Sequence, residues 1–168
     1  MESERPAGRP ATARRVAGYI YGTIVVLSVI VAGARTFPDE PGHIAVVAAV
    51  TSVVFWLAHV YADGLGHSVA TGEHLSLAEL TRIARREGAI VEATIFPVAA
   101  LMLGAFGVLS PSTAGWLAFG IGLAVLAAQG VTFARVERLG LVGTAVVVLV
   151  NVSLGLVLVA LKFYVSHH

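Results

Sequence analysis

The residues with the clearest chemical potential are ionisable side chains inside or beside long apolar stretches. His59, Asp63 and His67 are spaced i, i+4 and i+8, so they lie along one face if a helix continues past Ala62. Glu92 stands in an apolar run, where a charge costs about 2.5–3.5 kcal/mol on insertion scales and suggests a functional site. Imidazole and carboxylate groups bind Zn²⁺, Mn²⁺ and Fe²⁺. The pattern therefore predicts a divalent-metal site formed by His59, Asp63, His67 and Glu92.

A polar layer is predicted at one depth of the apolar runs. Glu92 and His59 are each four residues from the end of a run, and Gln129 and Thr144 are each six residues from an end. At 1.5 Å per residue these positions are roughly 5–8 Å inside the boundary. Asn151 would extend the layer inward. We expect Glu92, His59, Gln129 and Asn151 to serve transport or proton exchange, with His59 as the partner of Glu92.

Each of these residues also has a purely structural interpretation. Asp63 could cap a helix end, and His67 could be a solvent-exposed loop residue. His59 could simply hydrogen-bond between helices. Glu92 could lie near the surface and pair with an arginine such as Arg86. On this view the polar layer only fixes helix packing.

The composition indicates the environment in which these residues must work. The 168 residues are 57% hydrophobic and 12% charged, with a mean hydropathy of +0.87 and no cysteine. A soluble domain usually carries about 25% charged residues. A net charge of +1 provides no basic field for nucleic acid. The sequence therefore predicts a multi-pass protein of the cell membrane whose main partner is the lipid bilayer.

Five apolar runs predict an all-α bundle of five transmembrane helices. They cover residues 16–34, 44–62, 89–109, 114–134 and 139–161. About 20 residues are needed to cross a hydrocarbon core as a helix. Residues 14–168 then form one transmembrane domain, preceded by a disordered cytoplasmic tail over residues 1–13. Residues 63–88 form the one long hydrophilic connection, which is cytoplasmic.

The distribution of basic residues predicts the orientation. Nine of the eleven fall on one side of the five runs, which the positive-inside rule places in the cytoplasm. The N-terminus is therefore expected inside and the C-terminus outside. The nine are Arg5, Arg9, Arg14, Arg15, Arg82, Arg85, Arg86, Arg135 and Arg138.

The connection over residues 63–88 contains the signature of a short amphipathic helix. Gly64 and Gly66 favour a break after the second span. Ser76 and Glu79 then have the spacing of a capping box. In the helix that follows, one face is apolar, and the other carries arginines that would meet anionic lipid headgroups or, alternatively, only enforce topology. These arginines are Arg82, Arg85 and Arg86.

Small residues and one proline indicate how the helices pack. Gly18 and Gly22 form a Gly-x-x-x-Gly pair, which permits close approach of another helix. That helix would belong either to a second copy in a homodimer or to the same chain. Pro97 is expected to kink the third span near Glu92.

Residues 68–76 (SVATGEHLS), five spans and a cytoplasmic segment after the second together resemble the vacuolar iron transporter family. That resemblance implies a dimer that exchanges Fe²⁺ or Mn²⁺ for protons, with Glu73 as a metal ligand. The chain departs from the family at Tyr21, where the family carries aspartate, and at Val69, which replaces a methionine ligand. Residues 55–62 and 90–93 are also similar to small five-span proteins of high-GC bacteria, a likeness that implies no activity.

Three functions remain open from the sequence. The first is transport of a cation, either a divalent metal (Fe, Mn or Zn) or a proton, through the polar layer. The second is a metal-dependent membrane enzyme that acts on lipid, although the named enzyme motifs are absent. The third is a structural or partner-binding membrane protein.

Overall fold

The chain folds into helices only, over the ranges that the computed structural model describes, residues 9–72 and 74–166. The all-α class predicted from the sequence is therefore confirmed for these residues. The helices are α1 (Arg9–Thr36), α2 (Pro41–Thr71), α3 (Leu77–Glu87), α4 (Ala89–Ala105), α5 (Pro111–Val136) and α6 (Leu141–Ser166).

Several of these helices have the length and composition of membrane spans. In the described part of the chain, α1, α2 and α5 are each long and apolar enough to cross a bilayer alone. A fourth span results if α3 and α4, which are bent by 43° at their junction, are counted together.

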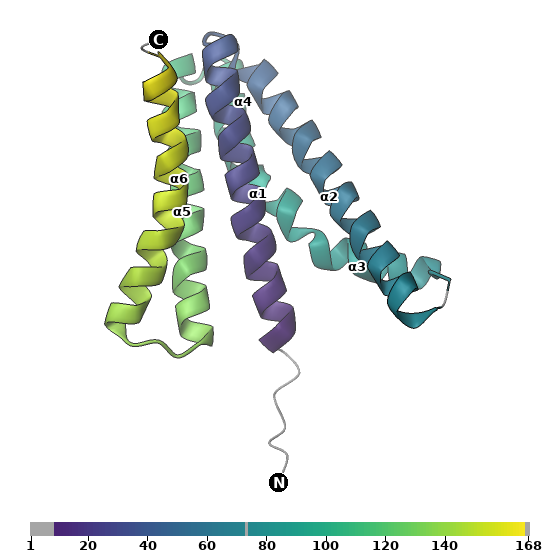
Figure 1. Cartoon of the computed structure of the whole chain (residues 1–168). Coiled ribbons are helices and arrows are strands. Elements are labelled where there is room, and N and C mark those ends of the chain that lie inside the picture. The colour runs from purple at the N-terminus through teal and green to yellow at the C-terminus, as the bar shows by residue number, and fades with distance from the viewer. Residues whose placement is uncertain (1–8, 73, 167–168) are drawn as a thin grey trace.

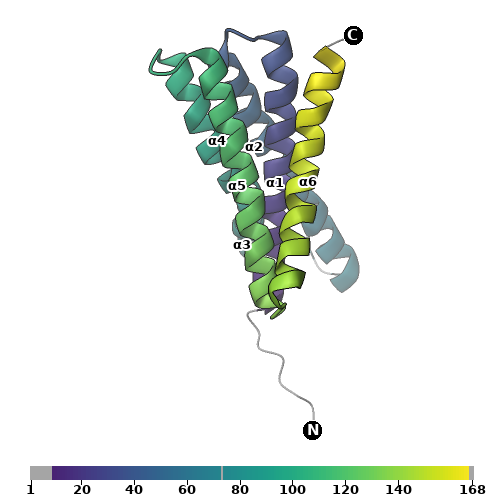
Figure 2. The same cartoon turned by 90° about the vertical axis from the view of Figure 1, so that its left-hand side faces the viewer.

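Helix α1 is the centre of the bundle. It contacts α2, α4, α5 and α6, while α5 and α6 form an antiparallel pair on one side (Figures 1 and 2). The buried core of the bundle includes Val26, Leu27 and Ile30 of α1, packed with Leu101 of α4 and Phe119 of α5. The start of α1 and the end of α6 lie at opposite ends of the bundle (Figure 1).

The close contact between α1 and α4 depends on the glycine pair in α1. A Cβ atom added at Gly22 would lie 2.5 Å from the carbonyl oxygen of Ile90, and one added at Gly18 would lie 3.1 Å from the Cβ of Ala89. The two backbones therefore touch inside one chain. Of the two expected uses of the pair, packing within the monomer is the one observed, so the pair no longer supports the predicted homodimer.

Helix α2 is longer than the sequence analysis predicted. It continues through Gly64 and Gly66 to Thr71 and ends at Gly72, which has a left-handed conformation (φ +69°). Residues 63–71 are thus helical and not part of a loose connection. The physical reason lies at Gly64, where an added Cβ would be 3.0 Å from the side chain of Leu75, so the glycine permits close packing and does not break the helix.

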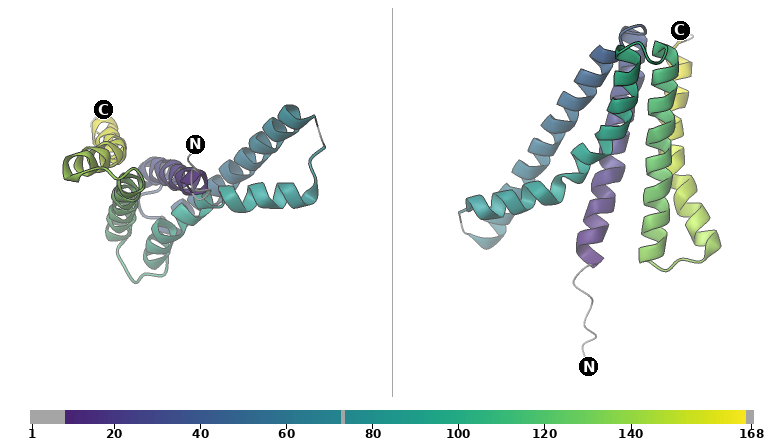
Figure 3. Two further views of the ribbon diagram at one scale, coloured as in Figure 1. Left: turned by 90° about the horizontal axis from the view of Figure 1, so that it is seen from below. Right: turned by 180° about the vertical axis from the view of Figure 1, so that it is seen from behind.

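The predicted amphipathic helix is present as α3. Both halves of the capping box form: Ser76 Oγ accepts from the N–H of Glu79, and the Glu79 carboxylate accepts from the N–H of Ser76. Trp56 of α2 donates its indole N–H to the carbonyl oxygen of Ala84 (2.9 Å), which fastens α3 to α2. The C-terminal half of α2 and α3 together form an arm that projects from the bundle (Figure 3). We refer to it as the α2–α3 arm.

Two further expectations concern the start of α1 and the course of α4. Helix α1 begins at Arg9, so residues 9–13 are helical and do not belong to a disordered tail; residues 1–8 lie outside the described part. Pro97 lies inside α4, which continues to Ala105, and the kink expected there stays a prediction; a separate bend of 43° occurs at the α3–α4 junction, marked by Gly88. Glu92 follows that bend by one helical turn.

Candidate functional site

Glu92 lies in the first turn of α4 and is held by two residues of α1. Its Oε2 accepts a short hydrogen bond from the hydroxyl of Tyr19 and an ion-paired hydrogen bond of 2.8 Å from Arg15. Arg15 also lies over the Tyr19 ring, 5.9 Å from its centroid. Arg15 and Tyr19 are four residues apart, so consecutive turns of α1 present both groups to one carboxylate.

The Glu92 carboxylate faces a pocket of about 350 Å³ between α1, α4 and α5. Gln129 of α5 lines the same pocket, as the shared depth of the two residues predicted, and Phe96 and Val125 supply apolar wall. The side chain of Glu92 is 41% exposed. The pocket thus brings together a carboxylate, a phenol and an amide, and the carboxylate is also bonded to the Arg15 guanidinium.

His59 is not the partner of Glu92. Its Nδ1 lies 2.9 Å from the carbonyl oxygen of Phe55, and its ring packs on Tyr21 at 4.9 Å between centroids. A carbonyl oxygen can only accept, so Nδ1 carries the hydrogen and Nε2 of the neutral ring is an acceptor. His59 lines a second pocket, of about 250 Å³, on another side of α1.

Asp63 joins this second pocket to the α2–α3 arm. Its carboxylate accepts a short hydrogen bond from Arg86 and lies 3.6 Å from Arg14. Arg86 also donates to Glu87 at 3.3 Å. Arg86 therefore pairs with Asp63 and Glu87, whereas the sequence alternatives placed it at the lipid surface or with Glu92. Arg82 and Arg85 are exposed on α3, and their contact with lipid headgroups stays a prediction.

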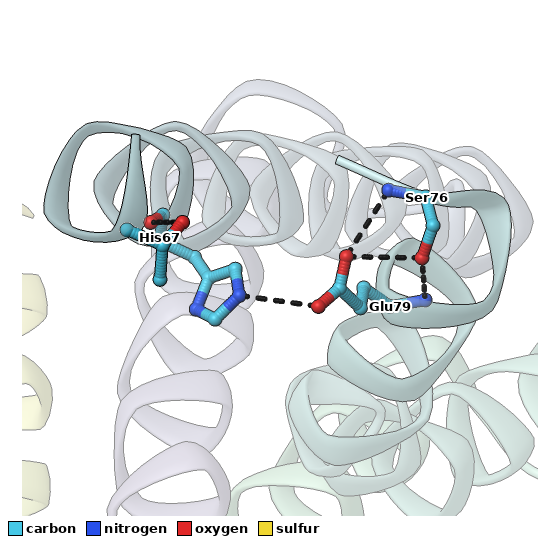
Figure 4. A network of polar contacts seen from close by, with 4 residues as sticks. His67, Ser76 and Glu79 are labelled. Carbon is cyan, nitrogen blue, oxygen red and sulfur yellow. Dashed lines mark hydrogen bonds and ion pairs between the residues drawn. The ribbon is translucent and has the colours of Figure 1, made fainter. Parts of the chain in front are cut away.

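His67 belongs to a third group, at the end of the α2–α3 arm. Its Nε2 lies 3.3 Å from Oε1 of Glu79, whose other oxygen belongs to the capping box with Ser76 (Figure 4). The Ser76 backbone N–H and hydroxyl, with a smaller contribution from His67, lower the pKa of Glu79. The helix cap and the histidine thus hold the same carboxylate in its ionised form.

The predicted metal ligands are distributed over these three groups. His59 and Asp63 line one pocket, Glu92 lines another, and His67 pairs with Glu79. Within residues 9–72 and 74–166, no three His, Asp or Glu side chains gather closely enough to hold a metal ion. Glu73 lies outside the described residues.

Polar contacts between helices were missed by the sequence analysis. Thr94 of α4 donates to Ser52 of α2 at 2.6 Å, and both residues are buried. Asn151 of α6 donates to the carbonyl oxygen of Leu126 in α5 at 3.4 Å, so it packs two helices together rather than extending the Glu92 pocket. The available signal was a lone hydroxyl or amide in an apolar run, which indicates burial but not the partner.

No family model, curated protein or solved structure matches the chain.

Proposed function

We propose that the chain is a five-span membrane protein with the start of α1 and the α2–α3 arm in the cytoplasm. Helix α4 has 17 residues and α6 has 26, and both lengths suit a span. The end of the bundle that holds the start of α1, α3 and the α5–α6 connection carries Arg14, Arg15, Arg86 and Arg135 (Figure 1). This basic end is the one that the positive-inside rule assigns to the cytoplasm.

The function we propose is movement of protons, alone or in exchange for another cation, through the Glu92 pocket. The observation that carries the proposal is the Glu92 carboxylate in a pocket between three helices, bonded to Tyr19 and Arg15. Ionisable groups in transmembrane segments pair with one another and mark ion pathways and proton relays. Protonation of Glu92 would weaken its ion pair with Arg15, and the Tyr19 hydroxyl can pass a hydrogen bond in either direction.

The pairing with arginines favours a proton over a divalent metal as the species bound at Glu92. A divalent metal at Glu92 or Asp63 would lie beside a guanidinium that is already paired with the same carboxylate, and repulsion between the two cations would oppose its binding. A proton needs only one carboxylate oxygen, and its binding weakens the ion pair with Arg15 without placing a second cation beside it. Fe²⁺, Mn²⁺ or Zn²⁺ would then be the exchanged cation and not the group held at this site.

The test is proton flux into proteoliposomes that contain a trapped pH-sensitive dye. We expect the wild-type protein to carry flux down an imposed pH gradient and Glu92→Gln to abolish it, because the amide cannot exchange a proton. Glu137→Gln is the matched control, since Glu137 is exposed at the end of α5. Equal flux in wild type and Glu92→Gln would contradict the proposal. Mn²⁺ added on one side tests whether a second cation is exchanged.

A structural role is the second candidate, and it has its own observation. The polar pairs join different helices: Arg15 with Glu92, Thr94 with Ser52, and Asn151 with Leu126. If they only fix packing, Glu92→Gln lowers the melting temperature and the wild-type protein carries no flux. Measuring melting and flux on the same preparations separates the two candidates.

A further inference from the structure

We infer that the second pocket binds the headgroup of phosphatidylethanolamine from the cytoplasmic leaflet. This inference rests on the proposed orientation of the bundle but not on proton movement through the Glu92 pocket. The second pocket lies on another side of α1 and shares no lining residue with the Glu92 pocket.

The charges around the second pocket are balanced and separated. Arg14, Asp63 and Glu87 line it, and Arg86 bridges the two carboxylates. Two cations and two anions leave no net charge, so neither an anion nor a cation is favoured by the overall field. His59 adds an acceptor, because its Nδ1–H is used by Phe55. A zwitterion whose two ends have opposite signs matches this arrangement.

The two ends of a phosphoethanolamine group have distinct partners available. Arg14 is 3.6 Å from Asp63 with its side chain 59% exposed, so it is loosely held and free to donate to a phosphate oxygen. The arginines contact Oδ2 of Asp63 and Oε1 of Glu87, so the three N–H donors of the ammonium group suit the other oxygen of each carboxylate and the Nε2 of His59. A choline group lacks these donors, and a glycerol headgroup lacks the positive charge.

The size and walls of the pocket suit a headgroup whose acyl chains remain in the bilayer. Its volume of about 250 Å³ lies just below the roughly 300–1,000 Å³ typical of sites that enclose a drug-sized ligand. Gly18 and Ile90 form apolar wall. Tyr21 continues that wall towards Phe55, on which its ring packs edge-on at 5.8 Å. Arg14, Asp63 and Glu87 belong to the start of α1, the C-terminal half of α2 and the end of α3, the parts that the proposed orientation places nearest the cytoplasmic headgroups.

The experiment measures lipid retained by the purified full chain by native mass spectrometry. Micelles carry equal amounts of phosphatidylethanolamine, phosphatidylcholine and phosphatidylglycerol with the same acyl chains. We expect phosphatidylethanolamine to be retained over each of the others by roughly threefold to fivefold, the size of effect that an exposed ion pair supports. Excess soluble phosphoethanolamine is expected to leave the retained lipid in place, because the acyl chains contribute to binding.

Two variants assign the effect to the second pocket. Asp63→Asn is expected to reduce retained phosphatidylethanolamine to the level of phosphatidylcholine, because Asp63 is assigned to the ammonium group. Arg14→Gln is expected to lower the retention of all three lipids, because each of them carries the phosphate. Arg135→Gln is the matched control, because Arg135 is exposed at the end of α5 and does not line the second pocket. Thermal melting verifies that each variant is folded. If Arg14→Gln does not fold, Asp63→Asn alone tests the inference. Equal retention of the three lipids, preference for phosphatidylglycerol, displacement by soluble phosphoethanolamine, or wild-type behaviour of the folded variants would each overturn the inference.

Discussion

Glu92 depends on two residues that are more than 70 positions away in the sequence. The charge of Arg15 and the hydroxyl of Tyr19 reach it because α1 and α4 pack closely at Gly22 and Ile90. The sequence predicted that Glu92 is a site residue and that Gln129 shares its depth. It could not predict the partners, because they are determined by which helices pack together and not by any local spacing.

Removal of the Tyr19 hydroxyl should take one hydrogen bond from the Glu92 carboxylate and leave its ion pair with Arg15 in place. Tyr19→Phe leaves Arg15 as the remaining partner, and a hydrogen bond to a charged group is worth about 1.5–3 kcal/mol. We therefore expect proton flux to fall by roughly tenfold or more. The control is Tyr61→Phe, because Tyr61 is 71% exposed on α2. Equal flux in the two variants would show that the Tyr19 hydroxyl has no part in proton movement.

The buried hydrogen bond between Thr94 and Ser52 should contribute to stability. Thr94→Val keeps the shape of the side chain but replaces the donating hydroxyl with a methyl group. Hydrogen bonds between helices in membranes contribute about 0.6 kcal/mol on average and up to about 1.7 kcal/mol. We expect a lower melting temperature with flux retained. Thr132→Val is the comparison, because the Thr132 hydroxyl bonds to the carbonyl oxygen of Ala128 within its own helix. A melting temperature unchanged from wild type would contradict the assignment.

At the scale of helices, the contact between α1 and α4 limits what can replace Gly22. A methyl group there would lie 2.5 Å from the Ile90 carbonyl oxygen, so Gly22→Ala must separate the backbones. Overpacking of this kind costs about 1–3 kcal/mol. We expect a clear drop in the melting temperature and in flux, since Glu92 would move away from α1. Gly120→Ala, where nothing lies within 4 Å, should melt at or above the wild-type temperature. A higher melting temperature for Gly22→Ala than for Gly120→Ala would contradict the role of Gly22 in helix packing.

The start of α3 should respond to acid through Glu79. Its pKa is lowered from the ordinary value of 4.5, chiefly by Ser76, so the folded state favours the carboxylate. This stabilisation is complete above pH 4.5 and is lost as the pH falls through the lowered pKa. Trp56 reports on α3 through its bond to Ala84, so its fluorescence in a Trp116→Phe background should change below about pH 4.5. Glu79→Gln should remove that component; an identical acid response in both proteins would contradict it.

The helices show which local signals the sequence carries reliably. The capping box at Ser76 and Glu79 predicted the start of α3, because its two reciprocal bonds depend only on residues three apart. The end of α2 was placed too early at Gly64, because that glycine lies against Leu75. A glycine can either end a helix or allow another segment to pack closely against the helix, and the sequence alone does not distinguish the two.

For the whole molecule, the orientation in the membrane can be mapped directly because the chain has no cysteine. Ser112 is exposed at the start of α5, and Thr81 is exposed on α3 near the other end. In intact cells, a membrane-impermeant maleimide should label Ser112→Cys, and should label Thr81→Cys only after permeabilisation. The reverse pattern would invert the proposed topology, and labelling of both in intact cells would exclude it. The composition predicted the helical class. The packing of a single chain does not show on which side of the membrane each end lies, or how many copies associate.

The most direct measurement is potential-driven proton flux through the reconstituted full chain. A potassium diffusion potential, negative inside, is imposed on vesicles that contain wild type, Glu92→Gln or Glu137→Gln, and the internal pH is followed. We expect acidification with wild type and Glu137→Gln, and none above empty vesicles with Glu92→Gln. Acidification by Glu92→Gln at the wild-type rate, or no acidification by the folded wild-type protein either with or without Mn²⁺ trapped inside the vesicles, would contradict the assignment of proton movement to Glu92.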